Sequence, residues 1–196
     1  GRKSFSGKML DLKNVVSLVG TSSDPFYKIS GLCYQSSNES DVGFVKGAAK
    51  VSNLEFDNAF FKSSKASSSV GIVAKNESNG SSVNHVYQNI IVSNSEFSGY
   101  YAGAVLGYGS AYISDISLKN VVIHGGNYAG GVVGFFNAEN LNWFGAAADY
   151  AYSKFNIEKI KIVKESSFNA NETYFGGIAG YVSQSSQKDW TQISIR

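Results

Sequence analysis

The sequence is poor in cysteine, and no long apolar run interrupts it. A single cysteine, Cys33, stands among 196 residues, so the chain has neither an internal disulfide framework nor a cysteine-based zinc site. Cys33 lies in the apolar run Ile29 to Tyr34, where we expect a buried, inert thiol. Because no stretch of about 18 apolar residues occurs, we expect no membrane insertion of this segment.

Charge is scarce as well. Charged residues make up 16% of the chain, and the formal net charge is +2. Lysine and arginine are spread along the chain and form no basic stripe, which argues against nucleic acid as a partner. The glycine-rich run 99–109 lacks the ending of a phosphate-binding loop, and no His-Glu-x-x-His motif occurs. We therefore predict no cofactor and no metal site.

Glycine, serine, asparagine and aromatic residues are plentiful instead. The chain has 21 glycines, and aromatic residues make up 14% of it. A disordered chain lacks such aromatic and aliphatic content. Turn-forming residues scattered among Val, Ile, Phe and Tyr predict many short strands, and hence an all-β protein.

A short glycine-marked block recurs along the chain. Its first glycines are separated by 27 to 32 residues, except for a gap of 46 before the last copy. One copy, Val70 to Lys75, has lost its last glycine, and Val16 to Gly20 is interpreted as a degenerate first copy. The repeat glycines are Gly43, Gly47, Gly71, Gly103, Gly107, Gly130, Gly134, Gly176 and Gly180.

A second element follows most copies, with apolar residues at its first, fourth and sixth positions. A third apolar patch comes after an asparagine: Ala59 to Phe61, Ile90 to Val92, and Val121 to Ile123. The second element is read at Val51, Leu54 and Phe56; at Val83 and Val86; at Ile113, Ile116 and Leu118; at Ile157, Ile160 and Ile162; and at Trp190, Ile193 and Ile195.

Three short strands per unit are the pattern of one coil of a parallel β-helix. We therefore predict a single right-handed β-solenoid over residues 1–196, with about six to seven coils. Asn58, Asn89 and Asn120 either form an inward ladder at a corner, in left-handed backbone geometry, or are ordinary exposed turn residues.

One long insertion, residues 135–154, is expected to project from the solenoid or to form a short helix. Its aromatic residues Trp143, Phe144, Tyr150 and Tyr152 are the candidate ligand-binding residues, as a platform for a glycan or a protein. The alternative, which we favour, is that they pack on the flank of the solenoid. A second tyrosine patch lies near the Gly103 block and comprises Tyr100, Tyr101, Tyr108 and Tyr112.

Few residues suggest catalysis. His85 and His124 have no nearby metal-ligating partner in the sequence, and we expect both to be surface or groove residues. Asp115 is the best candidate for a catalytic acid, since many β-helix proteins cleave polysaccharides. However, the residues aligned with Asp115 are Asn53 and His85, so a paired acid is missing. We predict that the chain is not an enzyme.

The blocks Gly130 to Gly134 and Gly176 to Gly180, each preceded by a strand and a polar turn, resemble the GLUG-type repeat. That repeat is found in large bacterial surface proteins and in the N-terminal regions of IgA1-specific metalloproteases. The segments Met9 to Leu12 and Gly20 to Phe26 resemble the lead-in to such arrays. The resemblance covers nearly the whole chain, with gaps at the copy near Gly71 and at the insertion. It implies a passive stalk or an adhesive region.

These observations predict a non-catalytic stalk or adhesin segment of a secreted or cell-surface bacterial protein, which binds a host protein or glycan through loops. The alternatives are an accessory region of a secreted metalloprotease and a β-helix carbohydrate-active enzyme. Strand-like patterns at both ends suggest a segment of a longer chain. Exposed coil edges would then permit end-to-end association.

Overall fold

The computed structural model describes residues 3–4, 9–12, 17–21, 27–76, 85–137, 156–162, 166–170, 174–183 and 194–195. The regular structure of these residues is all β-strand, and they contain no helix that could cross a membrane. The strands are β1 (Lys3–Ser4), β2 (Leu10–Asp11), β3 (Ser17–Val19), β4 (Tyr27–Ser30), β5 (Leu32–Ser36), β6 (Asp41–Lys46), β7 (Lys50–Asp57), β8 (Phe60–Ser63), β9 (Ser69–Lys75), β10 (Val86–Gly103), β11 (Leu106–Gly109), β12 (Tyr112–Gly130), β13 (Val133–Asn137), β14 (Asn156–Ile162), β15 (Ser167–Ala170), β16 (Tyr174–Gly176), β17 (Ala179–Ser183) and β18 (Ser194–Ile195).

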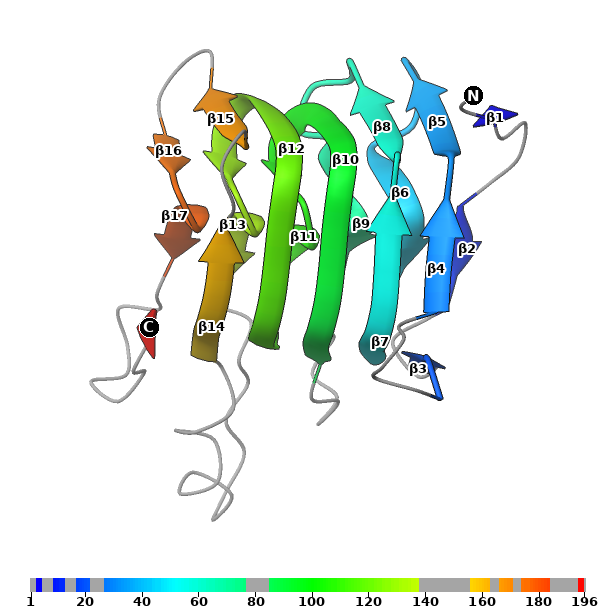
Figure 1. The fold of residues 1–196 in the computed structure, drawn as a ribbon. Helices are drawn as coiled ribbons and strands as arrows, with labels where there is room; N and C mark the ends of the chain where they lie inside the picture. The colour runs from blue at the N-terminus through cyan, green and yellow to red at the C-terminus, as the bar shows by residue number, and fades with distance from the viewer. Residues whose placement is uncertain are drawn as a thin grey trace, which may run out of the picture.

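The strands pair in parallel and fall into three stacks. In the first stack, β4, β7, β10, β12 and β14 lie side by side (Figure 1). In the second stack, β5 pairs with β8, and β8 pairs with the later part of β10. In the third stack, β6, β9, β11, β13 and β17 follow one another, and the last residues of β10 and β12 join it by pairing with the start of β9 and with β16. This mostly parallel sheet is compatible with a β-helix.

The core lies inside these stacks, because side chains alternate between the interior and the surface along each strand. Val51, Leu54 and Phe56 are buried at positions that pair with buried residues of β10. Ile113, Ile116 and Leu118 of β12 pair with the same β10 residues from the other side, and the register of β12 on β14 places them opposite Ile157, Ile160 and Ile162. The register confirms the apolar spacing read from the sequence on β7, β12 and β14, although Ile162 is 40% exposed.

The intervening level was misread. Tyr87, Ile90 and Val92 pair with Val51, Leu54 and Phe56. The interpretation that placed Val83 and Val86 there, and Ile90 to Val92 in the third patch, was therefore wrong. Tyrosine was not expected in the core, yet Tyr87 is fully buried because its hydroxyl has partners. It donates to the Ala48 carbonyl (3.0 Å) and accepts from Asn76 Nδ2 (2.7 Å).

Ile195 was also misplaced. It pairs with Ile157, which stands at the first position of its element, whereas the sequence interpretation gave Ile195 the sixth position. Trp190 and Ile193 lie outside the described residues.

Two columns of residues with left-handed backbone cross the stacked strands β7, β10 and β12. The asparagines expected in this geometry have it, with φ of 54° at Asn58, 56° at Asn89 and 51° at Asn120. Their grouping in one ladder was wrong, because the registers place Asn89 with Asn53 and Asp115, and Asn120 with Asn94 and Asn58. These six side chains are half-buried or exposed, so neither column points inward.

Each column is held by amide hydrogen bonds between levels. Asn89 Nδ2 donates to Asn53 Oδ1 (2.8 Å), and Asn120 Nδ2 donates to Asn94 Oδ1 (3.1 Å). Asparagine suits these sites because its short polar side chain tolerates left-handed backbone better than most residues do.

The repeat glycines lie in the third stack, where levels approach closely. Gly43 pairs with Gly71, and Gly103 pairs with Gly130, which in turn pairs with Gly176. A second column holds Gly107, Gly134 and Gly180, because their neighbours on both sides are paired. Those neighbouring pairs are Leu106 with Val133, Tyr108 with Phe135, Val133 with Ala179, and Phe135 with Tyr181.

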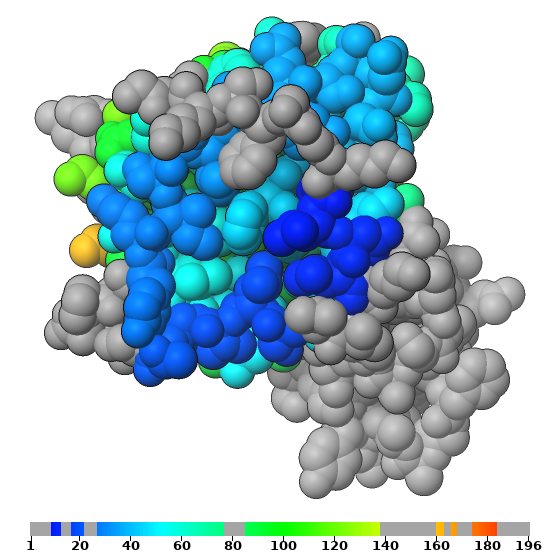
Figure 2. Space-filling model, turned by 90° about the vertical axis from the view of Figure 1, so that its right-hand side faces the viewer, coloured from blue at the N-terminus to red at the C-terminus, as the bar shows by residue number. Residues whose placement is uncertain are grey.

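Two repeat assignments were wrong. Gly47 (φ 65°) is not equivalent to Gly107, because the register of β9 on β11 places Ala74 opposite Gly107. Val16 to Gly20 is not a first glycine block either, because Ser17 to Val19 pairs with Lys50 to Ser52 of the first stack. Leu10 of β2 takes the place beside Val45 of the glycine block instead. Figure 2 looks onto this N-terminal end, where blue residues lie over cyan ones of the next level.

Candidate functional site

The surface of the third stack carries two adjacent columns of aromatic side chains, which we call the aromatic face. One column is Tyr101, Tyr128 and Tyr174, three residues that pair in register on β10, β12 and β16. The other is Tyr108, Phe135 and Tyr181, which pair in register on β11, β13 and β17. The parallel register therefore places an aromatic residue above an aromatic residue at three successive levels.

Rings within each column stack on one another. The centroids of Tyr101 and Tyr128 are 5.1 Å apart with an interplanar angle of 20°, and those of Tyr128 and Tyr174 are 5.0 Å apart at 2°. In the second column, Tyr108 and Phe135 are 5.1 Å apart at 20°, and Phe135 and Tyr181 are 4.9 Å apart at 33°. This spacing follows the distance between parallel strands, about 4.8 Å.

Rings in different columns meet edge to face. Tyr128 and Phe135 lie 5.1 Å apart at 83°, and Tyr174 and Tyr181 lie 4.9 Å apart at 65°. Both arrangements are favourable for aromatic pairs, at about 0.5–1.5 kcal/mol for each pair beyond the area that it buries. The six rings thus form one packed surface, and Tyr174, at 39% exposure, is its most open member.

Polar groups surround these rings. Asn137 Nδ2 donates to the Tyr108 hydroxyl (2.7 Å), and Ser183 Oγ donates to Asn137 Oδ1 (3.2 Å). The Lys75 ammonium lies 5.4 Å from the Tyr108 ring centroid, within cation–π distance. The hydroxyls of Tyr101, Tyr174 and Tyr181 form no hydrogen bond with the part of the chain that the structure describes.

The surroundings keep the tyrosines protonated. Partial burial, followed by the neighbouring Tyr100, raises the pKa of both Tyr101 and Tyr128 above the ordinary value. Near neutral pH the face therefore presents hydroxyls that can donate or accept hydrogen bonds, rather than phenolates.

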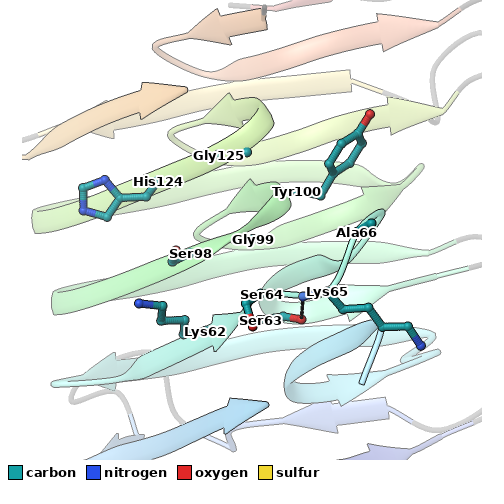
Figure 3. A pocket seen from close by; sticks show the side chains of 11 residues that line it. Lys62, Ser63, Ser64, Lys65, Ala66, Ser98, Gly99, Tyr100, His124 and Gly125 are labelled. Carbon is teal, nitrogen blue, oxygen red and sulfur yellow. Dashed lines mark hydrogen bonds between the residues drawn. The ribbon is translucent and has the colours of Figure 1, made fainter. Parts of the chain in front are cut away.

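An open groove of about 330 Å³ lies beside the aromatic face (Figure 3). Tyr100 belongs to both, because it lines the groove and its ring lies 4.7 Å from Tyr101 and 5.7 Å from Tyr128. Lys62, Ser98 and His124 follow one another on β8, β10 and β12 along the same surface. The remaining lining residues are Ser63, Ser64, Lys65, Ala66, Gly99, Gly125 and Gly126.

The structure brings together three of the four residues of the predicted second tyrosine patch. Tyr100, Tyr101 and Tyr108 are in ring contact, whereas Tyr112 begins β12 beside Val86, in the first stack. The sequence reading missed Tyr128, Phe135, Tyr174 and Tyr181. Aligning the glycine blocks could have revealed them, because each aromatic residue either precedes a block by one residue or follows its last glycine directly.

The structure does not describe the predicted site in the insertion. Phe135 to Asn137 belongs to strand β13, so the first residues of the predicted insertion are part of the third stack. Trp143, Phe144, Tyr150 and Tyr152 lie outside the described residues. Their role as ligand-binding residues remains a prediction.

Other sequence candidates are now placed. His124 lines the groove, as expected, but His85 is 1% exposed, so its placement at the surface was wrong. Asp115 lies at an exposed bend in the column of Asn53 and Asn89, and His85 is not its neighbour in register. Cys33 is half-buried rather than buried. Within the described ranges, no three His, Cys, Asp or Glu side chains gather as they would around a metal ion.

Comparison of the chain with protein-family models, with curated proteins and with solved structures gives no match. The function must therefore be argued from the surface itself.

Proposed function

We propose that this chain is a segment of a right-handed parallel β-solenoid that binds a glycan through its aromatic face. In this proposal it is a non-catalytic adhesin or stalk region of a secreted or cell-surface bacterial protein. The parallel registers of the three stacks and the bends between them support the solenoid. The resemblance of the glycine blocks to GLUG-type repeats supports the surface location.

The aromatic face is the observation that carries the binding proposal. A sugar ring has apolar C–H faces and a polar edge of hydroxyls, so its binding site needs flat apolar area with hydrogen-bonding groups beside it. The six packed rings supply that area, and the tyrosine hydroxyls with Asn137 and Ser183 supply the polar partners. The columns cross three successive strand levels, so the surface suits a chain of sugars better than one monosaccharide.

The environment of Asp115 supports a binding role over a hydrolytic one. Glycoside hydrolysis needs two carboxyl groups that flank the bond to be cleaved. The column that contains Asp115 continues with the amides of Asn89 and Asn53, which cannot act as acid or base.

The test is binding to a glycan array and to a panel of host proteins, followed by affinity measurements for two variants. Tyr128→Leu combined with Phe135→Leu removes two central rings but keeps apolar volume, and we expect glycan affinity to fall about tenfold. Phe60→Leu is the control, because Phe60 is a half-buried aromatic residue on β8, in the second stack. Circular dichroism confirms that each variant is folded.

Full glycan affinity in the folded double variant would contradict the proposal. If the chain binds host proteins but no glycan, its ligand is a protein and the glycan part of the proposal is wrong. A third variant, in which a Gly-Ser loop replaces residues 138–153, tests the insertion. If only this variant loses binding, recognition belongs to the segment with Trp143, Phe144, Tyr150 and Tyr152.

A further inference from the structure

We infer that the glycan is an acidic polysaccharide, and that the groove beside Tyr100 receives its uronic acid carboxylates. This inference rests on the proposed function, because the aromatic face holds the same chain. It adds a chemical class of ligand and a second set of contacts.

The charged side chains that line the groove are all positive among the described residues. Lys62 and Lys65 both line it, and none of its described lining residues is acidic. Neither lysine forms an ion pair within the described part of the chain, whereas Lys28 binds Glu55 (2.9 Å) and Lys46 lies 3.6 Å from Asp11. Glu96 lies two residues before Ser98 on β10 and does not line the groove. Within the described part of the chain, the groove therefore carries two ammonium groups and no carboxylate that offsets their charge.

The other lining groups suit a carboxylated sugar. Ser64, Ser98 and His124 add side chains that can donate hydrogen bonds, and Figure 3 shows Lys62, Ser98 and His124 following one another along the surface. Tyr100 closes one side, where the groove meets the aromatic face. A volume of about 330 Å³ is that of a small-ligand site, for which the range is roughly 300–1,000 Å³. It therefore fits a short stretch of a sugar chain.

The density of charge favours carboxylates over sulfates. Heavily sulfated chains call for dense cationic surfaces, often with the bidentate fork of arginine. Here the groove has only two lysines among its described lining residues, Lys62 on β8 and Lys65 just after that strand, and no arginine. This arrangement matches a chain that carries one carboxylate on each acidic sugar.

The aromatic face continues the same binding surface. Tyr100 connects the groove to Tyr101 and Tyr128, and Lys75 adds a cation at the other column through Tyr108. A polymer that places carboxylates in the groove can therefore lay neighbouring sugar rings on the tyrosines.

The experiment measures affinity for polygalacturonate, neutral dextran and dextran sulfate by calorimetry at low salt and at moderate salt. We expect polygalacturonate to bind at least about tenfold more tightly than dextran, and salt to weaken this binding. Lys62→Gln combined with Lys65→Gln should lower affinity for polygalacturonate about tenfold. Lys119→Gln combined with Lys161→Gln is the matched control, because it removes the same charge from exposed lysines of the first stack.

Several results would overturn the inference. Equal binding to dextran and polygalacturonate, or no effect of the groove variant, leaves the glycan proposal standing and rejects the acidic ligand. An equal loss in the control variant means that net charge, and not the groove, binds the polymer. Tighter binding of dextran sulfate than of polygalacturonate would show that the groove prefers sulfate groups to carboxylates. If no glycan binds at all, including those of the array, the proposed function fails together with the inference.

Discussion

At the scale of single residues, His85 is the most unusual group in the core. Its Nδ1 lies 2.9 Å from the Ala48 carbonyl, which can only accept, so Nδ1 carries the proton. Its Nε2 is buried and has no hydrogen-bond partner among the described residues. Protonation of Nε2 would place a charged donor in this site without an acceptor. Burial accordingly lowers the pKa of His85 below its ordinary value, and the Ala48 hydrogen bond opposes this only in part.

Stability should therefore fall as the solution becomes mildly acidic. The unfolded chain binds a proton at His85 near pH 6.5, whereas the folded chain resists it until a lower pH. Between these two pKa values the free energy of unfolding decreases by up to about 1.4 kcal/mol per pH unit as pH falls. Urea unfolding at pH 7.5 and 5.5 measures this decrease, and His85→Gln should reduce it. An unchanged pH dependence in that variant would show that His85 does not titrate in this way.

At the scale of strands, Gly103 shows what the third stack requires. A Cβ at this position would lie 2.5 Å from the Leu106 carbonyl oxygen and 2.6 Å from the Gly134 nitrogen. Both atoms belong to the backbone, which cannot move aside without breaking pairing between levels. Glycine is thus needed here for close approach of the strands.

Gly103→Ala should accordingly lower the free energy of unfolding by about 3 kcal/mol. Gly177→Ala is the matched control, because a Cβ there would have no neighbour within 4 Å, and Gly177 is exposed. Denaturant unfolding compares the two variants. Equal stability of both would mean that the levels can separate to admit a methyl group, contrary to the packing described.

The sequence predicted strands and their period better than it predicted register. The spacing of Ile113, Ile116 and Leu118 was recognisable because all three are aliphatic. At the preceding level, a tyrosine replaces the first aliphatic residue, and its burial depends on Asn76 and Ala48, which follow the ends of β9 and β6. Local pattern cannot reveal such partners, so the alignment slipped by four residues, from Val83 to Tyr87.

The candidate site was predicted only in part, through Tyr100, Tyr101 and Tyr108, for a related reason. Tyr101, Tyr128 and Tyr174 are far apart in the sequence, and each alone is an ordinary surface tyrosine. They form a face only because parallel pairing places them in register. Once the glycine blocks are aligned in the structure, the aromatic columns follow from the same repeat.

At the scale of the whole molecule, each level is held mainly by the levels on either side of it. The central strands β10 and β12 are paired on both sides, with β7 before them and β14 after them. Strand β2 pairs with β6, and Leu10 is 51% exposed. Stability in such a stack is close to a sum of nearest-neighbour interactions, so it should decrease from the centre toward the ends.

Amide hydrogen exchange measures this gradient strand by strand. We expect amides of Ile90, Val92, Ile116 and Leu118 to exchange at least about a hundredfold more slowly than those of Leu10 and Asp11, after correction for intrinsic rates. The reason is that a central strand must lose its pairing on both sides before its amides can exchange, whereas β2 only has to separate from β6. Repeating the measurement at several protein concentrations adds the control. If end strands of different molecules pair, as unprotected strand edges permit, protection of β2 rises with concentration. Uniform protection at low concentration would instead show that the stack opens as one cooperative unit.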